Sequence, residues 1–321
     1  MTPNVKYFAR TMFKLKVYQS EGFAFEHLFA AVLEASRPGF LKIKPYGNQG
    51  DRGNDGYEKA HGRYFQVFAP NDPSHSLQEA INKVETDFVA KLLPYWGQFC
   101  AVKEYFFVFN DKYRGTVFPL EKSLTELQKQ HGLVAAEVFR ARDLEDEFML
   151  LAEDQIMSII GGLPDEDAIA ALDYSVIAEV MQHIQDSPPC VSGRGKLVVP
   201  DIDEKIWFNG LERNGHWLKA KQAETWQLDE YFSVNSSFTK QDLRDYLASL
   251  YASSLRDFPS IEGQTEEELG DVRFAAILQH IAPSTGRPAV DRVRRDVALV
   301  IMAKYFETCD IFEEPRNAAA G

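Results

Sequence analysis

The sequence predicts an α/β domain with a mixed sheet flanked by helices, followed by a mainly α-helical region. Two observations lead to this fold class. In the first 150 residues, short aromatic and β-branched segments alternate with helical apolar stripes, which is the order of an α/β domain. After a cluster of prolines and glycines, the apolar residues recur mainly at helical spacing.

The elements of the N-terminal domain follow from these patterns. Residues 20–36 carry apolar side chains at every third or fourth position, which predicts the first helix. Adjacent strands followed by alternating helices and strands predict a mixed sheet. The expected strands are Phe40–Lys44, Tyr64–Phe68, Lys103–Asn110 and Leu133–Phe139, and the later helices are Ser76–Leu92, Leu120–His131 and Asp143–Ile160.

The prolines and glycines between residues 186 and 196 predict a linker. We therefore expect a first domain at residues 1–160, a helix and linker at 161–200, and a mainly helical domain at 201–321, which would bind partners. Helices are expected in this last domain at 239–251 and 290–306.

Charge is distributed unevenly along the 321 residues, whose net charge is −13. Residues 1–150 hold 19 basic and 19 acidic side chains, and the remainder holds 16 basic and 29 acidic ones. The neutral half could approach a phosphate backbone, whereas the acidic half is better suited to protein partners.

Several classes of protein are excluded by the composition. The chain has no apolar run of roughly 18 residues, as a membrane span would need, and its N-terminus lacks the features of a secretory signal. The three cysteines are widely spaced, which argues against disulfides and a cysteine zinc site. No phosphate-binding loop is present, so an ATPase would be another polypeptide. We expect a cytoplasmic protein without a membrane partner.

A turn with the sequence DRGNDG precedes the strand YFQVF. The turn has no apolar residue and its glycines permit positive φ, so it is expected to be tight, exposed and to present Asp51 and Asp55. Gln66 is the polar member of the strand, and a hydrogen bond to neighbouring backbone is one explanation for it. Glu26 lies at the edge of the apolar stripe of the first helix, where it could also extend to solvent.

This order of elements resembles the restriction-endonuclease-like, or PD-(D/E)XK, superfamily. The GDRGNDG turn before YFQVF is particularly similar to the Mrr branch, in which a Gly- and Asp-rich turn precedes a strand with Gln-x-Lys. The resemblance implies that Glu26, Asp55 and Gln66 hold a divalent metal, Mg²⁺ or Mn²⁺. Oxygen ligands suit Mg²⁺, which stabilises a phosphodiester transition state and activates water.

The sequence departs from this pattern at Phe68, which stands where the family has lysine. Phenylalanine can neither orient the attacking water nor offset developing negative charge. A lysine from another element could do so, and the candidates are Lys59 and Lys83. We prefer Lys83 because it lies on a predicted helix, although a solvated helix residue is the alternative interpretation. The expected catalytic residues are Glu26, Asp55, Gln66 and Lys83.

Three strings in the C-terminal region resemble the C-terminal domains of ABC-three-component antiviral systems, the group that includes Lamassu. They are DEKIWFNGL at 203–211, LDEYF at 228–232 and FETCDIFEEP at 306–315. The resemblance implies a prokaryotic defence component acting with an SMC-like ABC ATPase and a small third subunit. A helical scaffold with a solvated acidic surface is the simpler interpretation of this half.

Two functions follow from the sequence. The first is a metal-dependent DNA endonuclease effector that partner subunits control. The alternative is a catalytically inactive nuclease-fold protein that binds DNA or assembles the complex. A phosphodiesterase acting on RNA or a nucleotide would use the same metal chemistry. The sequence leaves a homo-oligomer open.

Overall fold

The computed structural model describes residues 1–44, 50–164, 174–186, 202–234, 240–260, 264–307 and 311–313. The chain forms two compact units, residues 16–159 and residues 1–15 together with 160–321. The sequence-based division placed residues 1–15 in the N-terminal domain, whereas here they pack with the C-terminal residues. The boundary falls within the first helix, α1 (Pro3–Gln19). Most of the predicted linker, from residue 187 to 200, lies outside the described residues.

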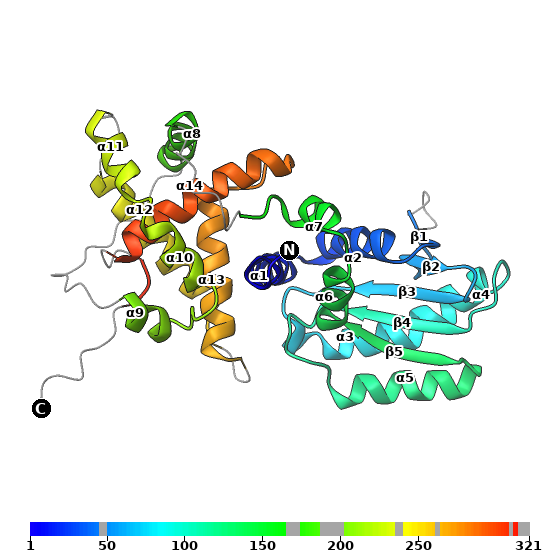
Figure 1. Ribbon diagram of the computed structural model, residues 1–321. Helices are drawn as coiled ribbons and strands as arrows, with labels where there is room; N and C mark the ends of the chain where they lie inside the picture. Colours follow the sequence, from blue (N-terminus) through cyan, green and yellow to red (C-terminus); the bar gives the residue numbers. More distant parts are fainter. Residues whose placement is uncertain are drawn as a thin grey trace, which may run out of the picture. The chain divides into compact units, whose positions relative to one another are not determined.

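A five-stranded mixed sheet forms the centre of the unit at residues 16–159, which confirms the predicted α/β class (Figure 1). The first three strands pair antiparallel, and the third, fourth and fifth pair parallel. The second strand was not predicted, because three residues between turns are too short to show an alternating pattern. In sheet order the strands are β1 (Phe40–Lys42), β2 (Gly56–Glu58), β3 (Arg63–Phe68), β4 (Glu104–Phe109) and β5 (Ala135–Arg140).

Helices cover both faces of this sheet (Figure 1). One face carries α2 and α6, and the other carries α3, the π-helical segment that continues it, and α5. The bounds are α2 (Gly22–Ser36), α3 (Leu77–Asn82), the π-helical segment Lys83–Leu92, α4 (Leu93–Trp96), α5 (Phe118–His131), α6 (Ala141–Met149) and α7 (Glu153–Ile160).

Two predicted helices differ from the observed ones. The helix expected at 76–92 is α-helical only to Asn82 and then widens into the π-helical segment. The helix expected at 143–160 is two helices, α6 and α7. The chain restarts at Ala152, whose backbone N–H donates to Gln155 Oε1 and so begins a new helical turn.

An aromatic core fixes α2 on the sheet. The ring of Phe29 lies 5.5–5.9 Å from the rings of Phe40, Phe65 and Phe139, which belong to three different strands or strand ends. Edge-to-face aromatic packing of this kind adds to the stabilisation from burial. The predicted apolar stripe is confirmed as buried, and it comprises Phe25, Leu28, Phe29, Val32 and Leu33.

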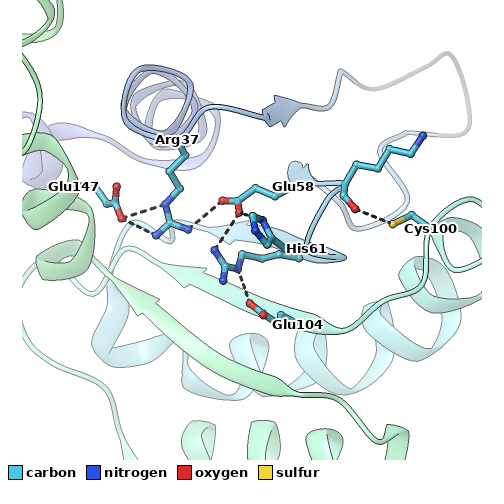
Figure 2. Close-up of polar contacts among 8 residues, drawn as sticks. Arg37, Glu58, His61, Cys100, Glu104 and Glu147 are labelled. Carbon is cyan, nitrogen blue, oxygen red and sulfur yellow. Dashed lines mark hydrogen bonds and ion pairs between the residues drawn. The ribbon is translucent and has the colours of Figure 1, made fainter.

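A chain of ion pairs runs from α2 across the ends of the strands (Figure 2). Arg37, at the end of α2, contacts Glu147 of α6 at 2.6 Å and Glu58 of β2 at 3.1 Å. Arg63 of β3 contacts Glu58 at 3.1 Å and Glu104 of β4 at 2.6 Å. Because Glu58 is buried between two guanidinium groups, it holds the short strand β2 in register with β3.

The other compact unit contains helices and no strand among its described residues, in agreement with the mainly helical region that the sequence predicted for residues 201–321. Within it, Arg295 of α14 is buried and donates to the carbonyl oxygens of Ile160 and Gly162. These bonds hold residues 160–162 against α14. No helix in the described ranges is long and apolar enough to cross a membrane. The helices after α7 are α8 (Tyr174–Gln185), α9 (Ile202–Phe208), α10 (Gly215–Gln222), α11 (Trp226–Val234), α12 (Lys240–Asp257), α13 (Glu266–Ile281) and α14 (Pro288–Glu307).

The aromatic core predicts a large difference between two phenylalanine substitutions. Phe29→Ala should lower the free energy of unfolding of residues 16–159 by about 3–5 kcal/mol, because it removes a fully buried ring and leaves a cavity. Phe118→Ala is the matched control, since Phe118 is 77% exposed at the start of α5, and should change it by less than about 0.5 kcal/mol. Urea denaturation followed by circular dichroism measures both, and equal effects would contradict this packing.

Candidate active site

A cavity of about 600 Å³ lies where α2, the turn at residues 51–55, β3 and the π-helical segment meet. All four residues predicted to be catalytic, Glu26, Asp55, Gln66 and Lys83, line it. Two helical elements from opposite faces of the sheet, the turn and one strand therefore contribute to one cavity. Its charged lining residues are Glu26, Asp51, Asp55, Asp72, Glu79, Lys83, Asp87 and Lys91.

Backbone hydrogen bonds place Asp55 at the edge of the sheet. Its N–H donates to the carbonyl of Phe65 at 2.9 Å, and its carbonyl accepts from the N–H of Ile43 at 3.1 Å. Its side-chain Oδ2 accepts from the N–H of Val67 at 2.6 Å. Among the described residues, Oδ1 accepts no hydrogen bond. One carboxylate oxygen thus anchors the turn to β3, and the other can receive a ligand.

The expectation of an exposed turn is wrong for Asp55, which is only 8% exposed. The turn folds back along β3, and this covers both Asp55 and the fully buried Asn54. The polar sequence suggested exposure because it has no apolar residue to bury. Backbone groups instead donate to its side-chain oxygens: the N–H of Gly56 donates to Asn54 Oδ1 and the N–H of Val67 to Asp55 Oδ2.

The pKa of Asp55 is raised to about 7, mainly because the carboxyl group is buried, and the negative charges of Asp51 and Glu26 contribute to this rise. The N–H of Val67 and the ammonium of Lys83 act in the opposite direction, because both favour the ionised carboxylate. Burial likewise raises the pKa of Glu26, with a further contribution from Asp51. The half-buried carboxylates of Glu26 and Asp51 therefore disfavour the ionised form of the buried Asp55.

Gln66 is 98% buried and both ends of its amide are engaged. Its Oε1 accepts from the hydroxyl of Tyr105 at 2.5 Å, and its Nε2 donates to Asp87 Oδ2 at 3.2 Å. Side chains, and not the neighbouring backbone, thus explain a polar residue in this strand. A carbonyl oxygen has two lone pairs, so the bond from Tyr105 leaves one acceptor position. The role of Gln66 as a metal ligand stays a prediction.

Lys83 lies beside the residue that replaces the expected lysine. Its Nζ is 5.6 Å from the centroid of the Phe68 ring and 3.9 Å from Asp87 Oδ2. The position is that of a cation over an aromatic face, at the cavity wall. The other candidate, Lys59, is exposed and does not line this cavity.

Asp87 is a cavity residue that the sequence did not single out. It accepts from Gln66 and contacts Lys91 Nζ at 2.6 Å as well as Lys83. Residues 83, 87 and 91 are spaced by four, which places their side chains on one side of a helix. The spacing of four residues could have predicted the ion pairs of Asp87 with Lys83 and Lys91. Nothing in the sequence predicted its hydrogen bond with Gln66 on β3.

The donor atoms fit a magnesium ion that keeps much of its water. In the part of the chain that the structure describes, no group of three or more His, Cys, Asp and Glu side chains is arranged to hold a metal. Glu26 and Asp55 supply two carboxylates with unbonded oxygens at one cavity. Mg²⁺ is commonly bound by one or two carboxylates, with waters and substrate phosphates completing its shell. The residues present fit that mode.

The C-terminal residues match a known family. Residues 175–313 match the model of C-terminal domain 10 of the ABC-three-component (ABC-3C) systems. This match supports ABC-3C membership. It spans the first two strings that predicted the resemblance and most of the third. No curated protein and no solved structure matches the chain. The restriction-endonuclease-like assignment of the first domain stays a prediction.

The raised pKa of Asp55 predicts a pH-dependent effect of Asp55→Asn. Between about pH 4 and pH 7 the folded protein keeps a proton that the unfolded chain has lost, so stability falls as the pH rises. Asparagine does not titrate and can still accept from Val67. The variant should therefore gain roughly 2–3 kcal/mol in unfolding free energy over the wild type on going from pH 5 to pH 8.

Urea denaturation in metal-free buffer at several pH values measures this difference. A difference between Asp55→Asn and the wild type that stays constant from pH 5 to pH 8 would show that the carboxyl group is not perturbed.

Proposed function

We propose that this chain is the metal-dependent nuclease effector of an antiphage ABC-three-component system. The family match supports a component of a prokaryotic defence system. The nuclease part rests on one observation: the buried carboxyl of Asp55, with its raised pKa, shares a cavity with Glu26 and Lys83. A carboxyl strongly perturbed by burial and by other carboxylates in a cleft is typical of a functional site.

The charge of the cavity supports a cation there. Six carboxylates and two lysines line it, so a phosphodiester entering alone would be repelled. A divalent ion bound by Glu26 and Asp55 would offset this charge and would favour the ionised form of Asp55, whose pKa is raised mainly by burial. Binding of substrate is therefore expected to depend on the metal.

Each of the four residues would have its own role in the cleavage reaction. Glu26 and Asp55 would hold Mg²⁺ or Mn²⁺, with the carbonyl of Gln66 as a neutral third ligand. When bound, such an ion polarises the phosphoryl oxygens and lowers the pKa of a coordinated water. Lys83 would donate hydrogen bonds to the attacking water or to the phosphate oxygen that gains negative charge. The ring of Phe68, whose centroid is 5.6 Å from Nζ, would help to hold the ammonium at the cavity wall.

DNA is the proposed substrate, and RNA or a nucleotide would be cleaved by the same chemistry. The proposed partners are an SMC-like ABC ATPase and a small third subunit, which sense DNA and restrain the nuclease until it is needed. The residues that match the ABC-3C model are the proposed contact region for these subunits.

A second function is favoured by the engagement of Gln66 and by the aromatic residue at position 68. If the amide of Gln66 serves only to join Tyr105 and Asp87, the cavity lacks its third ligand. The chain would then be an inactive nuclease fold that binds DNA or assembles the complex.

Plasmid cleavage distinguishes these functions. With Mg²⁺ or Mn²⁺, the protein alone or with its partner subunits should nick or linearise plasmid DNA, and Asp55→Asn or Glu26→Gln should abolish this. Lys83→Met should lower the rate by about 10²–10³, because it removes a donor to the developing charge. Lys122→Met, at an exposed position on α5, should leave the rate unchanged.

The inactive fold would be indicated by two results. One is the absence of cleavage with either metal, with and without partners. The other is a residual cleavage that Asp55→Asn and Glu26→Gln do not reduce, since such cleavage would come from a contaminant.

A further inference from the structure

An exposed aromatic cluster stands next to the cavity. Tyr95, Trp96 and Phe99 pack against one another with ring centroids 5.5–6.4 Å apart. Phe99 is 67% exposed and Tyr95 is 36% exposed. The indole N–H of Trp96 donates to the backbone carbonyl of Asp51 at 3.0 Å, and Asp51 lines the cavity. The cluster and the cavity therefore share one turn.

Arg52 adds a cation to this cluster. Its guanidinium carbon lies 5.5 Å from the centroid of the Tyr95 ring, in the geometry of a cation–π contact. Arg52 is partly exposed, and among the described residues it forms no ion pair with a carboxylate. A cation without an acidic partner is available to a phosphate.

The backbone of Arg52 is also unusual, because its φ is +60°. This left-handed conformation is costly for a residue with a side chain, and glycine would adopt it more easily. Such strain is concentrated at functional positions. The next residue, Gly53, also has positive φ. A glycine at position 52 would adopt this conformation without strain, but the residue there is an arginine that contacts Tyr95.

We propose that Arg52, Tyr95 and Phe99 form a binding site for the unpaired bases of single-stranded DNA. This inference rests on the proposed nuclease function and names its substrate class. Exposed aromatic rings stack on bases of any sequence, and an adjacent arginine contacts the backbone. The bases of a duplex are already stacked on one another and are not free to do so. The strand would run from this cluster across the shared turn to the cavity.

Fluorescence anisotropy with the full-length protein tests the site. The probes are a labelled single strand of about 20 nucleotides, long enough for one binding site, and the duplex of the same sequence. Ca²⁺ replaces Mg²⁺ so that the DNA is not cut. Phe99→Ala and Tyr95→Ala should each weaken single-strand binding by about tenfold and change duplex binding much less. Phe118→Ala is the matched control, because it removes a phenylalanine from α5 that is 77% exposed, against 67% for Phe99.

Arg52→Gly provides a variant that keeps the backbone conformation, since glycine accepts positive φ. It should also weaken single-strand binding, and its binding should depend less steeply on salt, because one phosphate contact is lost. Thermal unfolding of each variant identifies any loss of binding that comes from unfolding.

Two results would overturn the site. The wild type could fail to prefer the single strand over the duplex, or Phe99→Ala could bind the single strand as tightly as the wild type. If, in the second case, Phe99→Ala also loses co-purification with a partner subunit, the cluster is a protein interface. The nuclease proposal is judged separately, by the loss of plasmid cleavage in Asp55→Asn.

Discussion

The hydrogen bond from the N–H of Val67 to the carboxylate of Asp55 is the constraint on which the N-terminal cavity depends. Together with the backbone bonds from Asp55 to Phe65 and from Ile43 to Asp55, it locks the polar turn against the central strand of the sheet. Burial of a carboxylate beside two others is costly, and it is tolerated here at the rim of a cavity. A bound cation would reverse that cost, because each carboxylate would gain an opposite charge.

The sequence predicted the helices and strands whose apolar residues recur at regular spacing. The apolar stripe of α2 and the aromatic strands β3 and β4 have the periodicities of a helix and of buried strands, and both are where they were expected. It did not predict β2, because three residues show no alternating pattern, and the ion pairs of its Glu58 with Arg37 and Arg63 had no signal in the sequence. At the break between α6 and α7, the side chain of Gln155 accepts from the N–H of Ala152, an interaction that the apolar pattern does not reveal.

The sequence predicted which residues line the candidate site, but not the hydrogen bonds and ion pairs between them. Glu26, Asp55, Gln66 and Lys83 line one cavity, although they come from four elements. Their chemistry could not be deduced from the chain, since the partners of Gln66 are Tyr105 and Asp87, which are 39 and 21 residues away in sequence. Exposure was misjudged at Asp55 for a similar reason: a polar turn can be buried when backbone groups satisfy it. Phe68 stands where the family pattern has lysine, and the structure places the ammonium of Lys83 next to its ring.

A carbon-13 NMR titration of the Asp55 carboxyl group, assigned by comparison with Asp55→Asn, tests the central claim that this carboxylate holds a divalent cation. In metal-free solution the pKa should be about 7, and saturating Mg²⁺ should lower it by at least one unit, because metal and proton compete for the same oxygens. A pKa that stays the same when Mg²⁺ is added, or that lies near 4 without it, would contradict the account.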